Sequence, residues 1–274
     1  MESFFSFLEK RVDDCSSLLC IGLDPHVSDL SAPTPEAARD FCLNLVKQTS
    51  RYAAAFKPNA AFFEVFGADG WTALKHVVDA IQEESDRLGS MIPVVLDAKR
   101  GDIASTAEAY ARSAFEKLDV DCITLSPYLG KDSIEPFIAN SEKGVFLLCK
   151  TSNPGAEDLQ DLVLLSGDPL HIHVAKLAQS WNTKNNVGLV VGATYPETLA
   201  RVRDTAPNMW FLAPGVGTQG ADVEAALKAG LRKDGKGMLI PVSRGNARAE
   251  KPGIAAAELR DQILEIRSSI FGDR

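Results

Sequence analysis

The 274-residue sequence lacks several features that mark whole classes of protein. It has no apolar run of the roughly 18 residues needed to cross a bilayer, so no membrane span is expected. It also lacks an excess of basic residues, because 29 Lys and Arg stand against 37 Asp and Glu, a formal net charge of −8. This balance argues against a general attraction to nucleic acid or to an anionic membrane. We therefore expect neither as a partner, and any anionic ligand must be held by a local site.

The cysteines are scattered and show no paired spacing. The five cysteines are odd in number and contain no C-x-x-C motif; they are Cys15, Cys20, Cys42, Cys122 and Cys149. This pattern predicts reduced, buried thiols in a cytoplasmic protein. In the first eleven residues an acidic residue precedes a short apolar stretch and the basic pair follows it, the reverse of a secretory signal.

Motifs for covalent and metal catalysis are missing as well. No Gly-x-Ser-x-Gly or Cys-His arrangement indicates a nucleophile. His171 and His173 have a spacing that suits a metal on a strand, but the sequence that follows them reads as a helix, where positions i and i+2 diverge. We predict no metal site.

What the sequence does contain is a regular series of short apolar segments, continuous and often β-branched, as expected of strands buried on both faces. The eight segments span residues 18–24, 53–59, 93–99, 122–127, 144–150, 187–193, 210–217 and 237–244. Segments with helical spacing separate them. Eight repeats of about 28 residues predict an α/β fold, a (β/α)8 TIM barrel with its strands between residues 18 and 244. A doubly wound open sheet is the alternative, but no G-x-G-x-x-G turn follows the first strand.

The two ends of the chain are predicted to add helices to the barrel. Apolar residues at 4, 5, 8 and 12 precede the first strand, and residues 254–270 follow the last, so we expect both segments to pack on the outside. No low-complexity linker divides the chain, and we interpret residues 1–274 as a single domain. Residues 151–170 have little regular pattern and are expected to form a lid or binding loop.

Charged residues stand at the C-terminal ends of the expected strands, where barrel enzymes have their reacting groups. Asp97 and Lys99 share one face of a strand, Asp102 follows that strand, and Lys57 ends the neighbouring one. Because nearby carboxylates stabilise an ammonium, we expect Lys99 to stay protonated and to act as an acid. A salt-bridge network that only closes the barrel mouth is the alternative. The presence of Lys57 beside the D-x-K pair favours catalysis.

A second group of residues suits an anion. Gly215 and Gly217 follow the seventh strand and Arg244 follows the eighth, the usual place for phosphate in such barrels. Glycines let backbone N–H groups approach the ligand, and an arginine offers two donors to its oxygens. A tight turn without a ligand is the alternative for the glycines, whereas Arg244 at the next strand end favours phosphate binding.

Together these motifs resemble the orotidine 5'-monophosphate decarboxylase family, and its longer-chain subgroup most closely. The resemblance runs from the first strand to the last, at residues 22–25 (GLDP), 56–59 (FKPN), 97–103 (DAKRGDI), 151–155 (TSNPG), 214–219 (PGVGTQ) and 243–245 (SRG). Many members have bulkier residues where Arg100 and Gly101 stand.

The resemblance implies decarboxylation of orotidine 5'-monophosphate to uridine 5'-monophosphate, the last step of pyrimidine nucleotide synthesis, in a homodimer and without a cofactor or metal. The implied catalytic residues are Asp97 against the leaving carboxylate, Lys99 as proton donor to C6, Lys57 in the charge network and Asp102 from the second subunit. The implied binding residues are Asp24 at the ribose, Ser152 at the pyrimidine edge, Pro214 on the apolar side of the ring, Gln219 and Arg244 at the phosphate, and Ile103 and Thr106 across the interface.

Two other functions remain open from the sequence. Related barrels that act on sugar phosphates, such as hexulose-phosphate synthases and keto-gulonate-phosphate decarboxylases, have a similar D-x-K-x-x-D motif but use magnesium. A non-catalytic nucleotide-binding barrel is the third possibility. No fused phosphoribosyltransferase segment is expected within the 274 residues.

Overall fold

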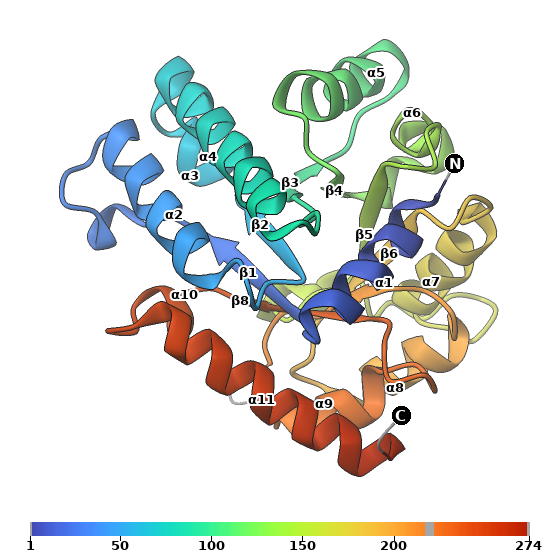
Figure 1. Ribbon diagram of the computed structural model, residues 1–274. Helices are drawn as coiled ribbons and strands as arrows, with labels where there is room; N and C mark the ends of the chain where they lie inside the picture. Colours follow the sequence, from blue (N-terminus) through green and yellow to red (C-terminus); the bar gives the residue numbers. More distant parts are fainter. Residues whose placement is uncertain (1, 217–221, 273–274) are drawn as a thin grey trace.

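The computed structural model describes residues 2–216 and 222–272, and eight parallel strands in them form a barrel (Figure 1). Neighbouring strands follow the order β2-β1-β8-β7-β6-β5-β4-β3. The circle closes between β2 and β3 through parallel bridges that join Phe56 to Val94 and Asn59 to Asp97. The (β/α)8 barrel expected from the periodicity is confirmed.

The strands coincide with the predicted apolar segments and are somewhat shorter at their ends. They are β1 (Leu19–Leu23), β2 (Ala55–Pro58), β3 (Val95–Arg100), β4 (Cys122–Leu125), β5 (Gly144–Lys150), β6 (Val187–Val191), β7 (Phe211–Leu212) and β8 (Met238–Val242). Most of their residues are buried on both faces, because side chains fill the barrel inside and helices cover it outside. Strand β3 differs, because it becomes polar and partly exposed from Asp97 onward, where the charged motif begins.

Helices surround the barrel in sequence order (Figure 1). They are α2 (Pro35–Thr49), α3 (Ala61–Glu64), α4 (Gly67–Leu88), α5 (Ala104–Arg112), α6 (Glu135–Ile138), α7 (Leu170–Trp181), α8 (Pro196–Thr205), α9 (Val223–Gly230) and α10 (Arg244–Ala247), flanked by α1 (Phe4–Cys15) and α11 (Pro252–Phe271). The start of α2 has the capping predicted for it, because the Thr34 side chain accepts a hydrogen bond from the Ala37 amide and Pro35 begins the helix.

The two flanking helices differ in position. Helix α11 packs along the side of the barrel against α2 and α9. Helix α1 lies across the end of the barrel where the strands begin (Figure 1), with the Phe5 ring stacked on Trp210 at a centroid distance of 6.1 Å. A side chain at Gly144, the first residue of β5, would collide with the Phe4 ring. Helix α1 thus closes the N-terminal end of the barrel. The sequence predicted only that this helix packs on the outside of the barrel.

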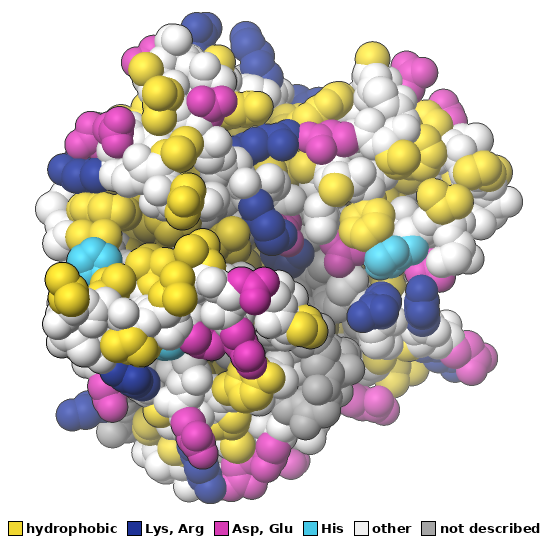
Figure 2. All heavy atoms as spheres, turned by 180° about the vertical axis from the view of Figure 1, so that it is seen from behind, with side chains coloured by type: hydrophobic (Ala, Val, Ile, Leu, Met, Phe, Trp, Pro, Cys, Tyr) yellow, Lys and Arg dark blue, Asp and Glu magenta, His cyan; other side chains and the backbone are white. Residues whose placement is uncertain are grey.

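The opposite end of the barrel is open. Figure 2 looks on this face and shows a hollow with Lys and Arg side chains in and around it. Among the described helices, none is long and apolar enough to cross a membrane.

Candidate active site

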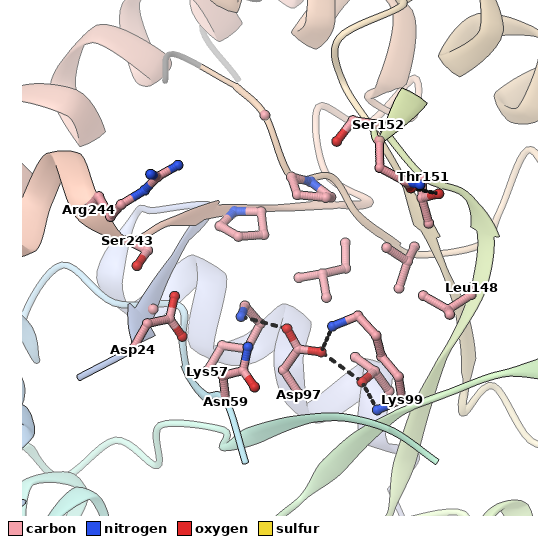
Figure 3. A pocket seen from close by; sticks show the side chains of 18 of the residues that line it. Asp24, Lys57, Asn59, Asp97, Lys99, Leu148, Thr151, Ser152, Ser243 and Arg244 are labelled. Carbon is pink, nitrogen blue, oxygen red and sulfur yellow. Dashed lines mark hydrogen bonds and ion pairs between the residues drawn. The ribbon is translucent and has the colours of Figure 1, made fainter. Parts of the chain in front are cut away.

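A cavity of about 620 Å³ lies at the C-terminal ends of the strands, where the charged motifs were predicted to meet. All eight strands, or the loops that follow them, contribute to its lining, which includes Asp24, Lys57, Asp97, Lys99, Thr124, Ser152, Pro214 and Arg244. In Figure 3, Ser243 and Arg244 lie at one end and Leu148, Thr151 and Ser152 at the other. A row of charged side chains lies between the two ends.

The row consists of Lys57, Asp97 and Lys99. The Lys57 ammonium donates to Asp97 Oδ2 at 3.0 Å, and the Lys99 ammonium donates to Asp97 Oδ1 at 2.5 Å (Figure 3). Lys57 is buried, whereas the Lys99 side chain is 49% exposed and lines the cavity. One carboxylate therefore holds two ammonium groups, one in the barrel wall and one that a ligand can reach.

Burial and charge act in opposite directions on this row. Burial alone would raise the pKa of the Asp97 carboxyl, but the charges of Lys57 and Lys99 and their hydrogen bonds outweigh it and lower the pKa to about 2. Burial would likewise lower the pKa of the Lys57 ammonium, but the negative charges of Asp97 and Asp24 raise it above its ordinary value. Asp97 and Lys57 are consequently both charged at neutral pH.

Asp24, at the end of β1, lies beside this row. Its Oδ1 is buried and has no hydrogen-bond partner among the described residues, although it faces a cavity large enough for a ligand. Gly22 keeps the neighbouring wall open, because a Cβ at Gly22 would lie 2.8 Å from the Ser243 Cβ. A buried carboxylate oxygen without a donor favours a ligand hydroxyl at this point.

Arg244 begins α10 directly after β8, and its exposed side chain lines the Ser243 end of the cavity. Pro214 and Gly215, after β7, line the same cavity. Gly215 has a φ of +104°, a conformation that glycine adopts without strain. Gln219, the other residue assigned to the phosphate by resemblance, lies outside the described residues, as does Gly217.

The long connection after β5 is folded back on its own start. Thr151, Ser152 and Asn153 line the cavity. Gln160 accepts a hydrogen bond from the Thr151 amide at 2.8 Å and donates one to the Thr151 hydroxyl at 2.9 Å. Lys150, another strand-end charge, does not line the cavity but binds both Asp161 oxygens, at 2.8 and 2.7 Å. These contacts hold the beginning of the loop over the cavity.

Residues 17–259 match the model described as "Orotidine 5'-phosphate decarboxylase / HUMPS family". The chain belongs to this family. The orotidine 5'-phosphate decarboxylase of Roseiflexus sp. (strain RS-1) is 47% identical over 258 residues, which cover 93% of this chain and 92% of the relative.

Two solved structures extend the comparison. Leishmania donovani OMP decarboxylase is 54% identical with a TM-score of 0.87, and the match covers 97% of this chain and 99% of that one. Leishmania donovani UMP synthase is also 54% identical, with a TM-score of 0.89, and the match covers 97% of this chain but 57% of that one. Sequence and structure thus agree on the fold and the family of this protein.

Three residues that the family resemblance assigned to the site lie away from this cavity. Asp102, Ile103 and Thr106 are in the connection from β3 to α5, and none of them lines it. The Asp102 carboxylate accepts a hydrogen bond from the Ile103 amide at 2.8 Å, and half of the Ile103 side chain is exposed. Among the described residues, no hydrogen bond or ion pair joins Asp102 to Lys99, whose ammonium binds Asp97.

Arg100 and Gly101, at which many family members were expected to have bulkier residues, make no ion pair with the charged row among the described residues. Arg100 turns toward Glu64, with which it pairs, and its guanidinium lies 5.2 Å from the centroid of the Tyr110 ring. A Cβ at Gly101 would lie 3.3 Å from the Ser126 Cβ, so a larger residue there requires Ser126 to give way.

The sequence did not single out several of the residues that line the cavity. They are polar (His26, Asn59, Thr124, Ser243), aromatic (Phe62) or apolar (Leu148, Val190, Leu212, Pro241). Asn59 and Ser243 follow strands within the quoted motifs, so position at a strand end was a usable signal for them. The apolar residues gave no signal, since buried strands consist of such residues throughout.

His171 and His173 lie in helix α7, as the sequence analysis predicted. In the part of the chain that the structure describes, no group of three His, Cys, Asp or Glu side chains is placed to hold a metal ion.

The depressed pKa of Asp97 predicts an acid-dependent contribution to stability. A folded-state pKa of about 2 against an ordinary 3.8 means that the unfolded chain binds the proton first as the pH falls. The stabilisation is present above 3.8 and is lost as the pH falls toward 2. We expect urea unfolding to show that the stability difference between wild type and Asp97→Asn shrinks by about 1 kcal/mol from about pH 5 to about pH 3. A difference that stays constant over this interval would contradict the pairing.

Proposed function

We propose that this protein converts orotidine 5'-monophosphate to uridine 5'-monophosphate and carbon dioxide. The observation that carries the proposal is the Lys99 ammonium, which reaches the cavity while Asp97 holds it from behind. Loss of carbon dioxide leaves an electron pair at C6 of the pyrimidine. A fixed ammonium beside C6 stabilises that charge as it develops and then donates a proton to it. The proton replaces the lost carboxylate, and Lys99 regains its proton from water.

The polar groups of the cavity have an order that suits the parts of this nucleotide. We assign the phosphate to Arg244 and Gln219, the ribose to Asp24 with its unpaired Oδ1, and the pyrimidine edge to Ser152. Pro214 would contact the apolar side of the ring. The phosphate is remote from the bond that breaks, so its binding energy is available to order the loops around the reacting atoms.

Asp97 has a second effect in the proposed reaction. The substrate carboxylate at C6 would lie near the Asp97 carboxylate, and two like charges at short range are unfavourable. This repulsion falls when the substrate carboxylate leaves as neutral carbon dioxide. Lys57 keeps Asp97 ionised throughout, because it is buried and remains bound to Asp97 Oδ2.

The decisive experiment mixes the purified protein with orotidine 5'-monophosphate in the presence of a chelator and follows ultraviolet absorbance. We expect the absorbance to fall as the substrate is consumed. Activity that is lost to the chelator and restored by magnesium would instead favour a sugar-phosphate enzyme of the same family. Tight nucleotide binding without turnover would indicate a non-catalytic barrel.

We also propose that the active unit is a homodimer in which Asp102 enters the site of the partner subunit, with Ile103 and Thr106 at the interface. The exposure of Ile103 supports this arrangement, as does the finding that none of the three residues lines the cavity of its own chain. Tyr128 and Leu129, also exposed, provide further apolar surface after β4.

Mixed dimers test the shared site. Lys99→Ala and Asp102→Ala homodimers are each expected to be inactive. A hybrid of the two has one site that lacks both groups and one site with Lys99 from one chain and Asp102 from the other. Mixing the two variants under subunit exchange should therefore restore activity, up to about one quarter of that of wild type for random pairing. If Asp102 serves its own subunit, no hybrid site is intact and activity stays absent.

We propose further that residues 1–274 form one domain and that the protein works in the cytoplasm. The chain of core contacts is continuous from α1 through the barrel to α11, which favours one domain. All five cysteines are buried and unpaired, as expected in a reducing compartment.

A further inference from the structure

The strand that contains Asp97 and Lys99 is irregular at these residues. Leu96 pairs with Ile123 of β4, but the next paired residue of β3 is Arg100, which pairs with Leu125. Three residues of β3, from 97 to 99, are thus opposed by the single residue Thr124. Lys99 lies in the left-handed backbone region with a φ of +47°, which is unfavourable for a residue other than glycine. The chain bulges where the proposed proton donor is attached.

A bulge leaves backbone N–H groups without a partner in the neighbouring strand. Here the Ala98 and Lys99 amides both donate to the Thr124 hydroxyl oxygen, at 3.0 and 2.9 Å. The regular ladder resumes directly afterwards, where the Ser126 amide donates to the Arg100 carbonyl at 2.8 Å. One side chain thus takes the place of the missing backbone acceptors.

The same hydroxyl also contacts the charged row. Thr124 Oγ1 donates its proton to Asp97 Oδ1 at 3.0 Å, and this oxygen is the one that binds the Lys99 ammonium. Two accepted hydrogen bonds and one donated bond fill the capacity of a hydroxyl group. Thr124 is 1% exposed, so water does not replace any of these bonds without opening the site.

We infer that Thr124 is a positioning residue, which fixes both the backbone of Lys99 and the carboxylate that aims its ammonium. This inference rests on the proposed function, in which Lys99 delivers a proton to C6. Thr124 acts through Asp97 and Lys99 and needs no charge of its own. The requirement is a hydroxyl on a side chain of this length at this position of β4.

Two substitutions separate the hydroxyl from the rest of the side chain. Thr124→Val keeps the shape and removes the oxygen, whereas Thr124→Ser keeps the oxygen and removes a methyl group. Thr49→Val is the matched control, since Thr49 is buried in α2 and its hydroxyl bonds only to the Leu45 carbonyl. Thermal unfolding of all three variants shows whether each one folds.

We expect Thr124→Val to lower kcat about 100-fold, because a reacting group misplaced by about an ångström loses that much. The affinity for uridine 5'-monophosphate should change by less than about threefold, since Arg244 and Asp24 bind other parts of the nucleotide. The kcat of Thr124→Ser should lie within about tenfold of the wild-type value, and the kcat of Thr49→Val within about twofold. A Thr124→Val enzyme with normal kcat, or a Thr124→Ser enzyme as impaired as Thr124→Val, would overturn the inference.

Amide hydrogen exchange of the ligand-free protein provides a measurement that does not depend on turnover. Exchange at Ala98 and Lys99 should be faster in Thr124→Val than in wild type, and unchanged in Thr124→Ser and Thr49→Val. If the wild-type protein fails to decarboxylate orotidine 5'-monophosphate, the proposed function is refuted. The amide exchange rates still show whether Thr124 holds the backbone of Ala98 and Lys99. Unchanged exchange in Thr124→Val would refute the positioning role in either case.

Discussion

Replacing Lys99 with alanine is expected to lower kcat by at least about 10⁴-fold, because it removes both the stabilising charge at C6 and the proton donor. Binding of uridine 5'-monophosphate should change little, since the product has no charge at C6 for the ammonium to stabilise. Steady-state turnover of orotidine 5'-monophosphate and calorimetric titration with the product measure the two quantities. A large loss of turnover with retained affinity identifies a group that acts on the transition state.

Lys228→Ala is a suitable control for this experiment. Lys228 is an exposed lysine of α9 that pairs with Glu224 one helical turn away, so its loss removes one positive charge that does not line the cavity. We expect this variant to retain full turnover. Lys99→Ala with turnover like that of the control would refute the role of Lys99, and the charged row would then serve only to close the barrel mouth.

Removal of the Arg244 side chain should have the second largest effect, on ligands that carry a phosphate. A guanidinium makes two charge-assisted hydrogen bonds to phosphate oxygens, so Arg244→Ala is expected to lower kcat/KM for orotidine 5'-monophosphate about 1,000-fold. The nucleoside orotidine lacks the phosphate and should be turned over equally slowly by variant and wild type. Comparison of the two substrates in both proteins measures this difference.

The neighbouring Arg248 offers a matched control. It begins the turn after α10, and its guanidinium binds the Asp29 carboxylate at 3.1 Å instead of lining the cavity. Arg248→Ala should leave kcat/KM for both substrates within about twofold of wild type. If Arg244→Ala weakens activity on the nucleoside as much as on the nucleotide, Arg244 does not bind the phosphate.

The sequence by itself was sufficient for the barrel and for much of the cavity. Strands buried on both faces have continuous apolar runs, and eight such runs at a regular interval leave few alternatives to a closed parallel barrel. In such a barrel the C-terminal strand ends meet at one face. The positions of Asp24, Lys57, Asp97, Lys99 and Arg244 in the chain therefore predicted that they would share a cavity, and in the structure they do.

Only the tertiary structure decided how these groups are held. Hydrogen-bond partners across a barrel depend on register, and the irregular register of β3 is invisible in a sequence in which Thr124 reads as one more buried strand residue. The placement of Lys150 against Asp161, and of Asp102 outside the cavity lining, likewise depends on how the connections between strands and helices fold back. Local patterns determine which segments become strands because burial periodicity is a short-range property. The direction of a side chain at a bulge is set by contacts between distant residues, and these exist only once the barrel has closed.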